Sequence, residues 1–71
     1  MPTITVYVHP VDRARREREI QAHREAIEEP GSGLRVVGKP KVRRVWNRRY
    51  IEQPDAPRTV FRVIFQVEKT Q

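Results

Sequence analysis

Hydrophobic and polar positions alternate strictly in the first strand-length segment of the chain. Residues 3–8 read Thr-Ile-Thr-Val-Tyr-Val, which puts Ile4, Val6 and Val8 on one face. Strict alternation of β-branched residues is typical of a half-buried strand. His9-Pro10 follows, and because proline cannot donate a ladder hydrogen bond, we expect the strand to end there.

From about Val11 to Glu29 the pattern changes to that of a helix. Arg, Glu, Ala and Gln dominate this segment, and most of them are good helix formers. Its apolar stripe is narrow, since Ile20 and Ile27 are the only large aliphatic side chains along it. We therefore expect a helix that covers a sheet but cannot form a core alone, and that ends at the Pro-Gly-Ser-Gly segment 30–33.

A second strand is predicted over about residues 34–50, but its pattern is irregular. Gly38 and Pro40 interrupt it. The step from Val42 to Val45 is an odd number of residues, so these two side chains would point to opposite faces of a regular strand. A β-bulge near Arg43-Arg44 would reconcile the two faces. Proline and a high density of basic side chains both favour a strand at the edge of the sheet.

The last predicted strand, about residues 58–69, is the most hydrophobic and follows a turn at residues 52–57. Its apolar side chains lie on both faces: Phe61, Val63, Phe65 and Val67 on one, Val60 and Ile64 on the other. A strand that is apolar on both faces belongs in the centre of a sheet.

The order strand, helix, strand, strand predicts a small α+β fold. A right-handed crossover with the last strand between the first two gives a three-stranded sheet of order 1-3-2 with one helix on one face, which is half of a ferredoxin-like fold. Residues 1–71 would form a single domain, and a core this thin favours a homodimer. The open face is expected to carry Thr5, Tyr7, Arg44, Trp46, Arg62, Ile64 and Gln66.

The net charge of the chain comes from one segment. Residues 1–29 contribute −1, residues 30–51 contribute +7 and residues 52–71 contribute 0, which together give +6. The middle segment has no acidic residue; its basic residues are Arg35, Lys39, Lys41, Arg43, Arg44, Arg48 and Arg49. Like charges this close repel one another unless an anion compensates them, so the segment predicts a polyanionic partner.

Nucleic acid, either DNA or RNA, is the partner that this segment favours, because arginine pairs bidentately with phosphate. The candidate binding residues are Lys39, Lys41, Arg43, Arg44, Arg48, Arg49 and Tyr50. A protein-interaction module that docks its basic edge strand on an acidic protein surface is the alternative. A solvated edge strand whose charges only prevent aggregation would need fewer charges.

Two further features allow more than one interpretation. Trp46 and Tyr50 could stack unpaired bases, but we expect Trp46 to be largely buried, in the core or at a dimer seam, and Tyr50 to be exposed. The arginines at the start of the helix could make a second phosphate contact if they lie near the basic strand, although a solvated helical face is favoured. These arginines are Arg13, Arg15, Arg16 and Arg18.

Catalytic, cofactor and metal motifs are not recognisable in this sequence. There is no cysteine, which excludes disulfides and thiolate metal sites and fits a cytoplasmic protein. Glu19 with His23, and His9 with Asp12, could each contribute two metal ligands, but a zinc site needs three or four, so we expect no metal. Ser32 has no base nearby in the sequence. A nuclease would need Glu52, Asp55 or a histidine as its general base. We therefore expect no catalysis, no cofactor and no membrane span.

Overall fold

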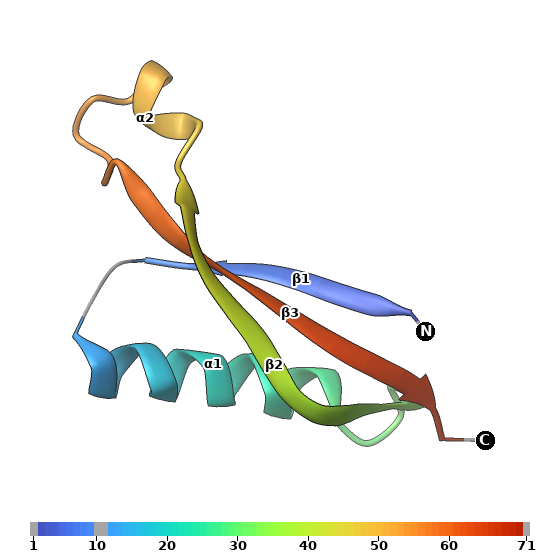
Figure 1. Ribbon diagram of the computed structural model, residues 1–71. Coiled ribbons are helices and arrows are strands. Elements are labelled where there is room, and N and C mark those ends of the chain that lie inside the picture. Colours follow the sequence, from blue (N-terminus) through green and yellow to red (C-terminus); the bar gives the residue numbers. More distant parts are fainter. Residues whose placement is uncertain (1, 10–11, 71) are drawn as a thin grey trace.

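The computed structural model describes residues 2–9 and 12–70. Along the chain follow β1 (Thr3–Val8), α1 (Arg13–Ile27), β2 (Leu34–Trp46), α2 (Arg49–Glu52) and β3 (Thr59–Lys69) (Figure 1). The predicted β-α-β-β order is confirmed, with the short helix α2 where the second strand was expected to continue. The expectations for Pro10 and Val11 lie outside the described residues.

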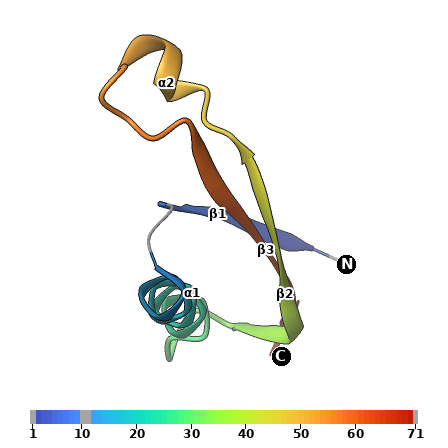
Figure 2. The same ribbon diagram turned by 60° about the vertical axis from the view of Figure 1, so that its left-hand side comes forward.

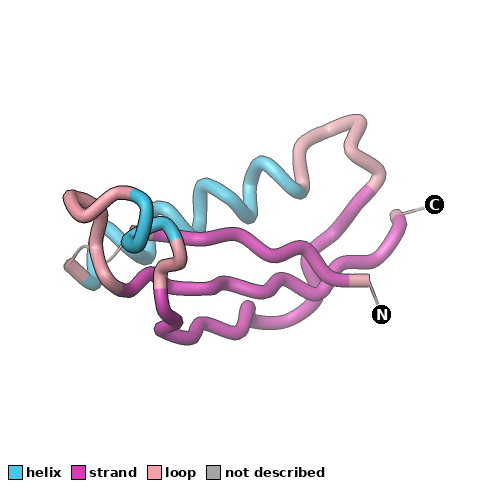
Figure 3. Tube along the Cα trace, turned by 90° about the horizontal axis from the view of Figure 1, so that it is seen from above, coloured by secondary structure: helices cyan, strands magenta, loops and turns pink. Residues whose placement is uncertain are grey.

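The three strands form one antiparallel sheet in the order β1-β3-β2. The central place of β3 and the edge place of β2 were both predicted and are confirmed. Because β1 and β2 are each antiparallel to β3, they run parallel to one another and α1 is the crossover between them. Seen from above, the strands lie next to one another, with α1 alongside them (Figure 3).

The core lies between α1 and the sheet and is built mainly by the strands. Its buried side chains are Val8, Val36, Phe61, Val63, Phe65 and Val67. No residue of α1 is buried, and the helix meets the core through the half-buried side chains of Ile20 and Ile27. The helix thus covers the sheet with the narrow stripe that the sequence predicts.

Both ends of α1 are capped by side chains. Asp12 is the N-cap, and its carboxylate accepts a hydrogen bond of 2.9 Å from the Arg15 backbone N–H. After the helix, the Ser32 hydroxyl donates to the Ile27 carbonyl at 2.7 Å and accepts from the Leu34 N–H at 3.2 Å. These bonds connect the end of α1 directly to the start of β2, so the crossover loop is short and held at both ends.

The pairing of β2 with β3 shifts register at Gly38, Lys39 and Pro40. Val37 lies opposite Gln66 and Lys41 lies opposite Ile64, so three residues of β2 face Phe65 alone. Gly38 has a φ of +69°, a left-handed conformation that glycine adopts without a steric penalty.

The predicted bulge at Arg43-Arg44 is therefore wrong, because these residues pair regularly with Arg62 and Phe61. Val42 and Val45 face opposite sides of the sheet without any irregularity between them. Val45 is apolar although it faces away from the helix, because it pairs there with the apolar Val60.

This register decides which basic side chains share a face. Directly opposite residues in an antiparallel pair project from the same side of the sheet. Arg44 and Trp46 lie opposite Phe61 and Thr59, on the helix side, so their predicted place on the open face is wrong. The other expected residues of that face are confirmed; they are Thr5, Tyr7, Arg62, Ile64 and Gln66.

The β2–β3 hairpin extends beyond the rest of the sheet. β1 ends with Val8 opposite Phe61, whereas β2 and β3 continue as a two-stranded ribbon that carries α2 at its end (Figures 1 and 2). We call residues 45–60 the hairpin arm. The arm makes the molecule elongated, with dimensions of 44 × 23 × 19 Å.

The left-handed conformation of Gly38 predicts the response to substitution there. Gly38→Ala should lower the free energy of unfolding by about 1–2 kcal/mol, because an added Cβ meets no neighbouring atom and the cost is purely conformational. Gly38→Asn should cost less, since asparagine tolerates this region better. Urea unfolding followed by circular dichroism measures both, and equal stability of all three proteins would contradict the left-handed conformation of Gly38.

Candidate functional site

The face of the sheet opposite α1 carries no acidic side chain along most of its length. By register this open face consists of Thr3, Thr5, Tyr7, Arg35, Val37, Lys41, Arg43, Val45, Val60, Arg62, Ile64, Gln66 and Glu68, and its one acidic residue, Glu68, pairs with Arg35 at one end. Across its middle runs a row of three directly paired residues, Tyr7, Arg62 and Arg43, with Arg62 on the central strand. Tyr7 is 62% exposed. The row therefore places an exposed aromatic ring and two guanidinium groups on one surface.

The candidate basic residues are exposed and lack carboxylate partners within residues 2–9 and 12–70. The ion pairs of this part of the chain use other arginines, namely Arg13, Arg15, Arg24 and Arg35. Arg35, the seventh basic residue of the segment, pairs with Glu68 across the strands. The remaining six keep their charge uncompensated; they are Lys39, Lys41, Arg43, Arg44, Arg48 and Arg49.

Arg44 of β2 and Arg16 of α1 both lie over the ring of Phe61 in β3. The guanidinium carbon of Arg44 lies 5.3 Å from the centre of the Phe61 ring, and that of Arg16 lies 4.4 Å from the same centre. Both distances are within the range of a cation–π interaction. Arg16 of α1 and Arg44 of β2 therefore share one ring of β3, and a second phosphate contact from the helix stays a prediction. Arg13 and Arg15 are paired with Glu17 and Glu19.

Asn47 closes the base of the loop that carries α2. Its backbone N–H donates to the Arg58 carbonyl at 2.8 Å, and its side-chain nitrogen donates to the Pro57 carbonyl at 2.7 Å. Its side-chain oxygen accepts from the Arg49 N–H at 3.1 Å. One asparagine thus joins the two strands of the hairpin arm and fixes the position of Arg48 and Arg49.

Trp46 lies outside the core. Its residue surface is 54% exposed, so the expectation that it is a core residue is wrong. The reason is that the hairpin arm continues past β1 and α1, so neither of these elements covers the indole. Burial at a dimer seam stays a prediction.

Tyr50 belongs to α2 rather than to a strand, and it is half-buried rather than exposed. Its ring meets that of Trp46 edge to face, with 5.7 Å between the centroids. Its hydroxyl accepts a hydrogen bond of 3.3 Å from Arg58 Nε, and the Arg58 guanidinium carbon lies 5.5 Å from its ring centre. These contacts hold α2 against the arm, which gives Tyr50 a packing role.

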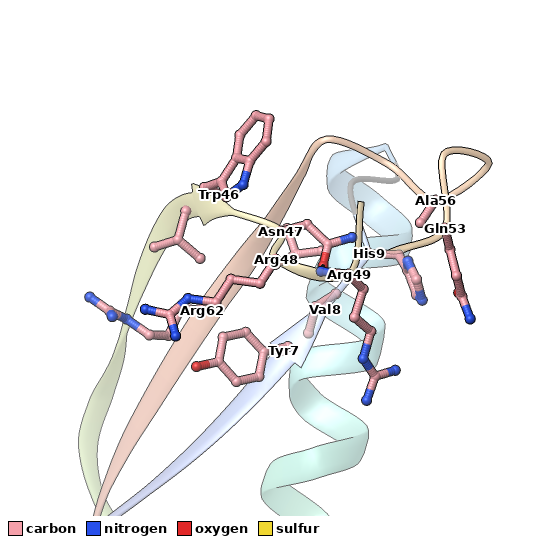
Figure 4. A pocket seen from close by; sticks show the side chains of 12 residues that line it. Tyr7, Val8, His9, Trp46, Asn47, Arg48, Arg49, Gln53, Ala56 and Arg62 are labelled. Carbon is pink, nitrogen blue, oxygen red and sulfur yellow. The ribbon is translucent and has the colours of Figure 1, made fainter. Parts of the chain in front are cut away.

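A broad open concavity lies where the hairpin arm leaves the sheet (Figure 4). Its volume is about 1130 Å³, and no acidic residue lines it; the lining residues are Tyr7, Val8, His9, Val45, Trp46, Asn47, Arg48, Arg49, Gln53, Ala56, Val60 and Arg62. In the close-up, Tyr7, Arg48 and Arg62 lie along one side, and His9, Arg49 and Gln53 along the other. This arrangement suits an anion with an apolar part.

Two kinds of side chain in the described residues are candidate reactive groups, the metal-ligating ones and the Ser32 hydroxyl. Among the described residues, no three His, Asp or Glu side chains come together to hold a metal ion. The Ser32 hydroxyl is engaged at the end of α1, where it donates to a backbone carbonyl. Of the described helices, none has the length and apolar character needed to cross a membrane.

Sequence reasoning did not include Tyr7, Arg62 or Asn47 among the binding residues. The alternation of the first and last strands put Tyr7 and Arg62 on the open face, but only the register makes them direct neighbours. Asn47 lies inside the predicted second strand, and nothing in its sequence context marks it. Comparison with known proteins adds no candidate: no family model, curated protein or solved structure matches the chain.

The role of Asn47 can be tested by stability. Asn47→Ala leaves the Pro57 carbonyl and the Arg49 N–H without their side-chain partner, and should lower the free energy of unfolding by about 1–2 kcal/mol. Asn47→Asp keeps the acceptor for the Arg49 N–H but puts a carboxylate oxygen against the Pro57 carbonyl oxygen, so it should also be less stable than the wild type. Thermal and urea unfolding measure the difference, and an alanine variant as stable as the wild type would rule out this role.

Proposed function

We propose that the protein is a small, non-catalytic nucleic-acid-binding protein that contacts phosphates through β2 and the hairpin arm. The observation that carries this proposal is the set of six exposed basic side chains without a carboxylate partner in the described chain, all between Lys39 and Arg49. Arginine and lysine in such numbers give a protein most of its affinity for a phosphate backbone.

Repulsion within the surface supports a polyanionic partner. Arg43 lies directly opposite Arg62, and like charges in directly opposed positions destabilise a sheet. Lys41 projects from the same face two residues away. A row of phosphates would relieve this repulsion, and the planar guanidinium groups match phosphate oxygens in pairs.

The same strand is poorly suited to docking on another protein by strand addition. The backbone N–H of Val36 donates to Glu28 Oε2 at 3.2 Å, so this part of the β2 edge is already occupied. The register shift at residues 38–40 interrupts the edge further along. Both features weaken β2 as a template for an added strand, and they favour nucleic acid over the acidic protein surface that remains the alternative.

Binding should be strongly dependent on salt. If about five basic side chains meet phosphates, the logarithm of the association constant should fall against that of the salt concentration with a slope of about −4 to −5 for duplex DNA. Replacing Arg48 and Arg49 by Gln should flatten this slope by about 2. Titration of labelled duplex and single-stranded probes over a salt series measures the slope.

Arg13→Gln with Arg15→Gln is the matched control. It removes the same charge from exposed arginines that are paired with glutamates, and it should leave the slope almost unchanged. Equal effects of the two double variants would mean that only net charge matters. Absence of binding to duplex DNA, single-stranded DNA and RNA at low salt would refute the proposal and assign the basic residues to an acidic protein.

We also propose that the protein is a homodimer. Trp46 and Val42 project from the same side of β2 and are both exposed, and Ile51 in α2 is 75% exposed. Aromatic and aliphatic side chains exposed together are typical of protein interfaces. A second copy would add buried apolar area to a core that is thin for a folded domain.

Sedimentation equilibrium tests this association at micromolar protein concentration, where a dimer is expected. Trp46→Ala should weaken the dimer, whereas Tyr7→Phe should not. A wild-type protein that stays monomeric throughout the concentration range would refute the dimer, and a Trp46→Ala protein that associates as well as wild type would place the seam elsewhere.

A further inference from the structure

The concavity beneath the hairpin arm joins an exposed aromatic ring to a group of arginines. Tyr7 lies directly opposite Arg62 in the sheet, and Arg48 and Arg49 reach the same space from the loop that Asn47 holds (Figure 4). Its volume of about 1130 Å³ is slightly above the usual range for sites that take small organic ligands. A nucleotide unit therefore has ample room there.

Arg62 is the most constrained charge of this site. Its Nε is buried and has no hydrogen-bond partner among the described residues, and its direct neighbours in the sheet are Tyr7 and Arg43. A partly desolvated cation without a carboxylate is unfavourable, and an anion nearby offsets this cost. The delocalised charge of the guanidinium can be compensated at the nitrogens that face the concavity, so Arg62 marks the position of a phosphate.

Tyr7 supplies a flat apolar surface beside that position. Tyr7 is 62% exposed although it lies within β1 and pairs directly with Arg62 of the central strand. Aromatic rings flanked by arginine are the usual platforms for unpaired bases, which stack on them while the cations hold the backbone. In a duplex both faces of each base are covered by its neighbours, so a ring in a recess can reach only an unpaired base.

We propose that the concavity binds one unpaired nucleotide of a single-stranded nucleic acid, with its base on the Tyr7 ring and its phosphate on Arg62 and Arg48. This inference rests on the proposed function and makes it more specific. It assigns the basic residues of the hairpin arm to the flanking phosphates. The protein then prefers single strands to duplex through the stacking contact, because the phosphate contacts alone do not distinguish the two.

The test compares a short labelled oligothymidine with the same strand annealed to its complement, by fluorescence anisotropy at one salt concentration. Wild type should bind the single strand more tightly. Tyr7→Ala should weaken single-strand binding by about 5- to 100-fold and leave duplex binding unchanged, because loss of one stacking platform has effects of this size. Tyr7→Phe keeps the ring and should bind like wild type.

Thr5→Ala is the matched control, because Thr5 lies on the same strand and face as Tyr7 but outside the concavity. It should bind both probes like wild type. Arg62→Gln should weaken binding of both probes and reduce the salt slope by about 1. Unfolding curves of Tyr7→Ala show whether the variant is folded. If it is not, the preference of wild type for the single strand still tests the site.

The outcomes separate this inference from the function on which it rests. Equal affinity of wild type for the two probes, or a Tyr7→Ala variant that binds the single strand as well as wild type does, overturns the nucleotide site and leaves phosphate binding intact. If wild type binds neither probe at low salt, the proposed function fails and the nucleotide site fails with it.

Discussion

The structure depends on the burial of one face of β3. Phe61, Val63, Phe65 and Val67 are all buried there, and both other strands pair with β3 and with nothing else in the described chain. The helix contributes no buried residue, so it shields an apolar surface that the strands have already assembled. Each buried side chain of this size contributes about 1.5–3 kcal/mol of transfer free energy. The fold therefore depends on β3, and the other elements are positioned by their contacts with it.

The length of β3 also creates the functional surface. β1 ends with Val8 opposite Phe61, while β3 extends beyond this pair and keeps β2 paired, so the hairpin arm stands clear of the helix. Arginines on this arm are exposed because no other element reaches them. The same geometry exposes Trp46 and leaves the concavity open on one side. A single difference in strand length thus separates a shielded core from a charged, accessible end.

Much of this fold can be predicted from the sequence, because its main signals are local. Alternation in residues 3–8 and the two apolar faces of residues 59–69 set the strand positions, and the chain order gives the topology. The register of β2 could not be predicted, because Val45 is apolar for a reason that local sequence does not show, its cross-strand pairing with Val60. The row of Tyr7, Arg62 and Arg43 joins three strands, so no local pattern reveals it. Its members become one site only through cross-strand pairing.

The bonds that Asn47 makes to Pro57 and Arg58 have a consequence for how the protein can change. They close residues 47–58 into a loop whose two ends are joined independently of its tip. Gln53, Pro54 and Asp55 at that tip are exposed and lie outside the sheet. Closed surface loops tolerate insertions at modest entropic cost, because the cost of closure grows only with the logarithm of length. The tip can therefore be lengthened or exchanged, by evolution or by design, while the sheet that supports it stays the same.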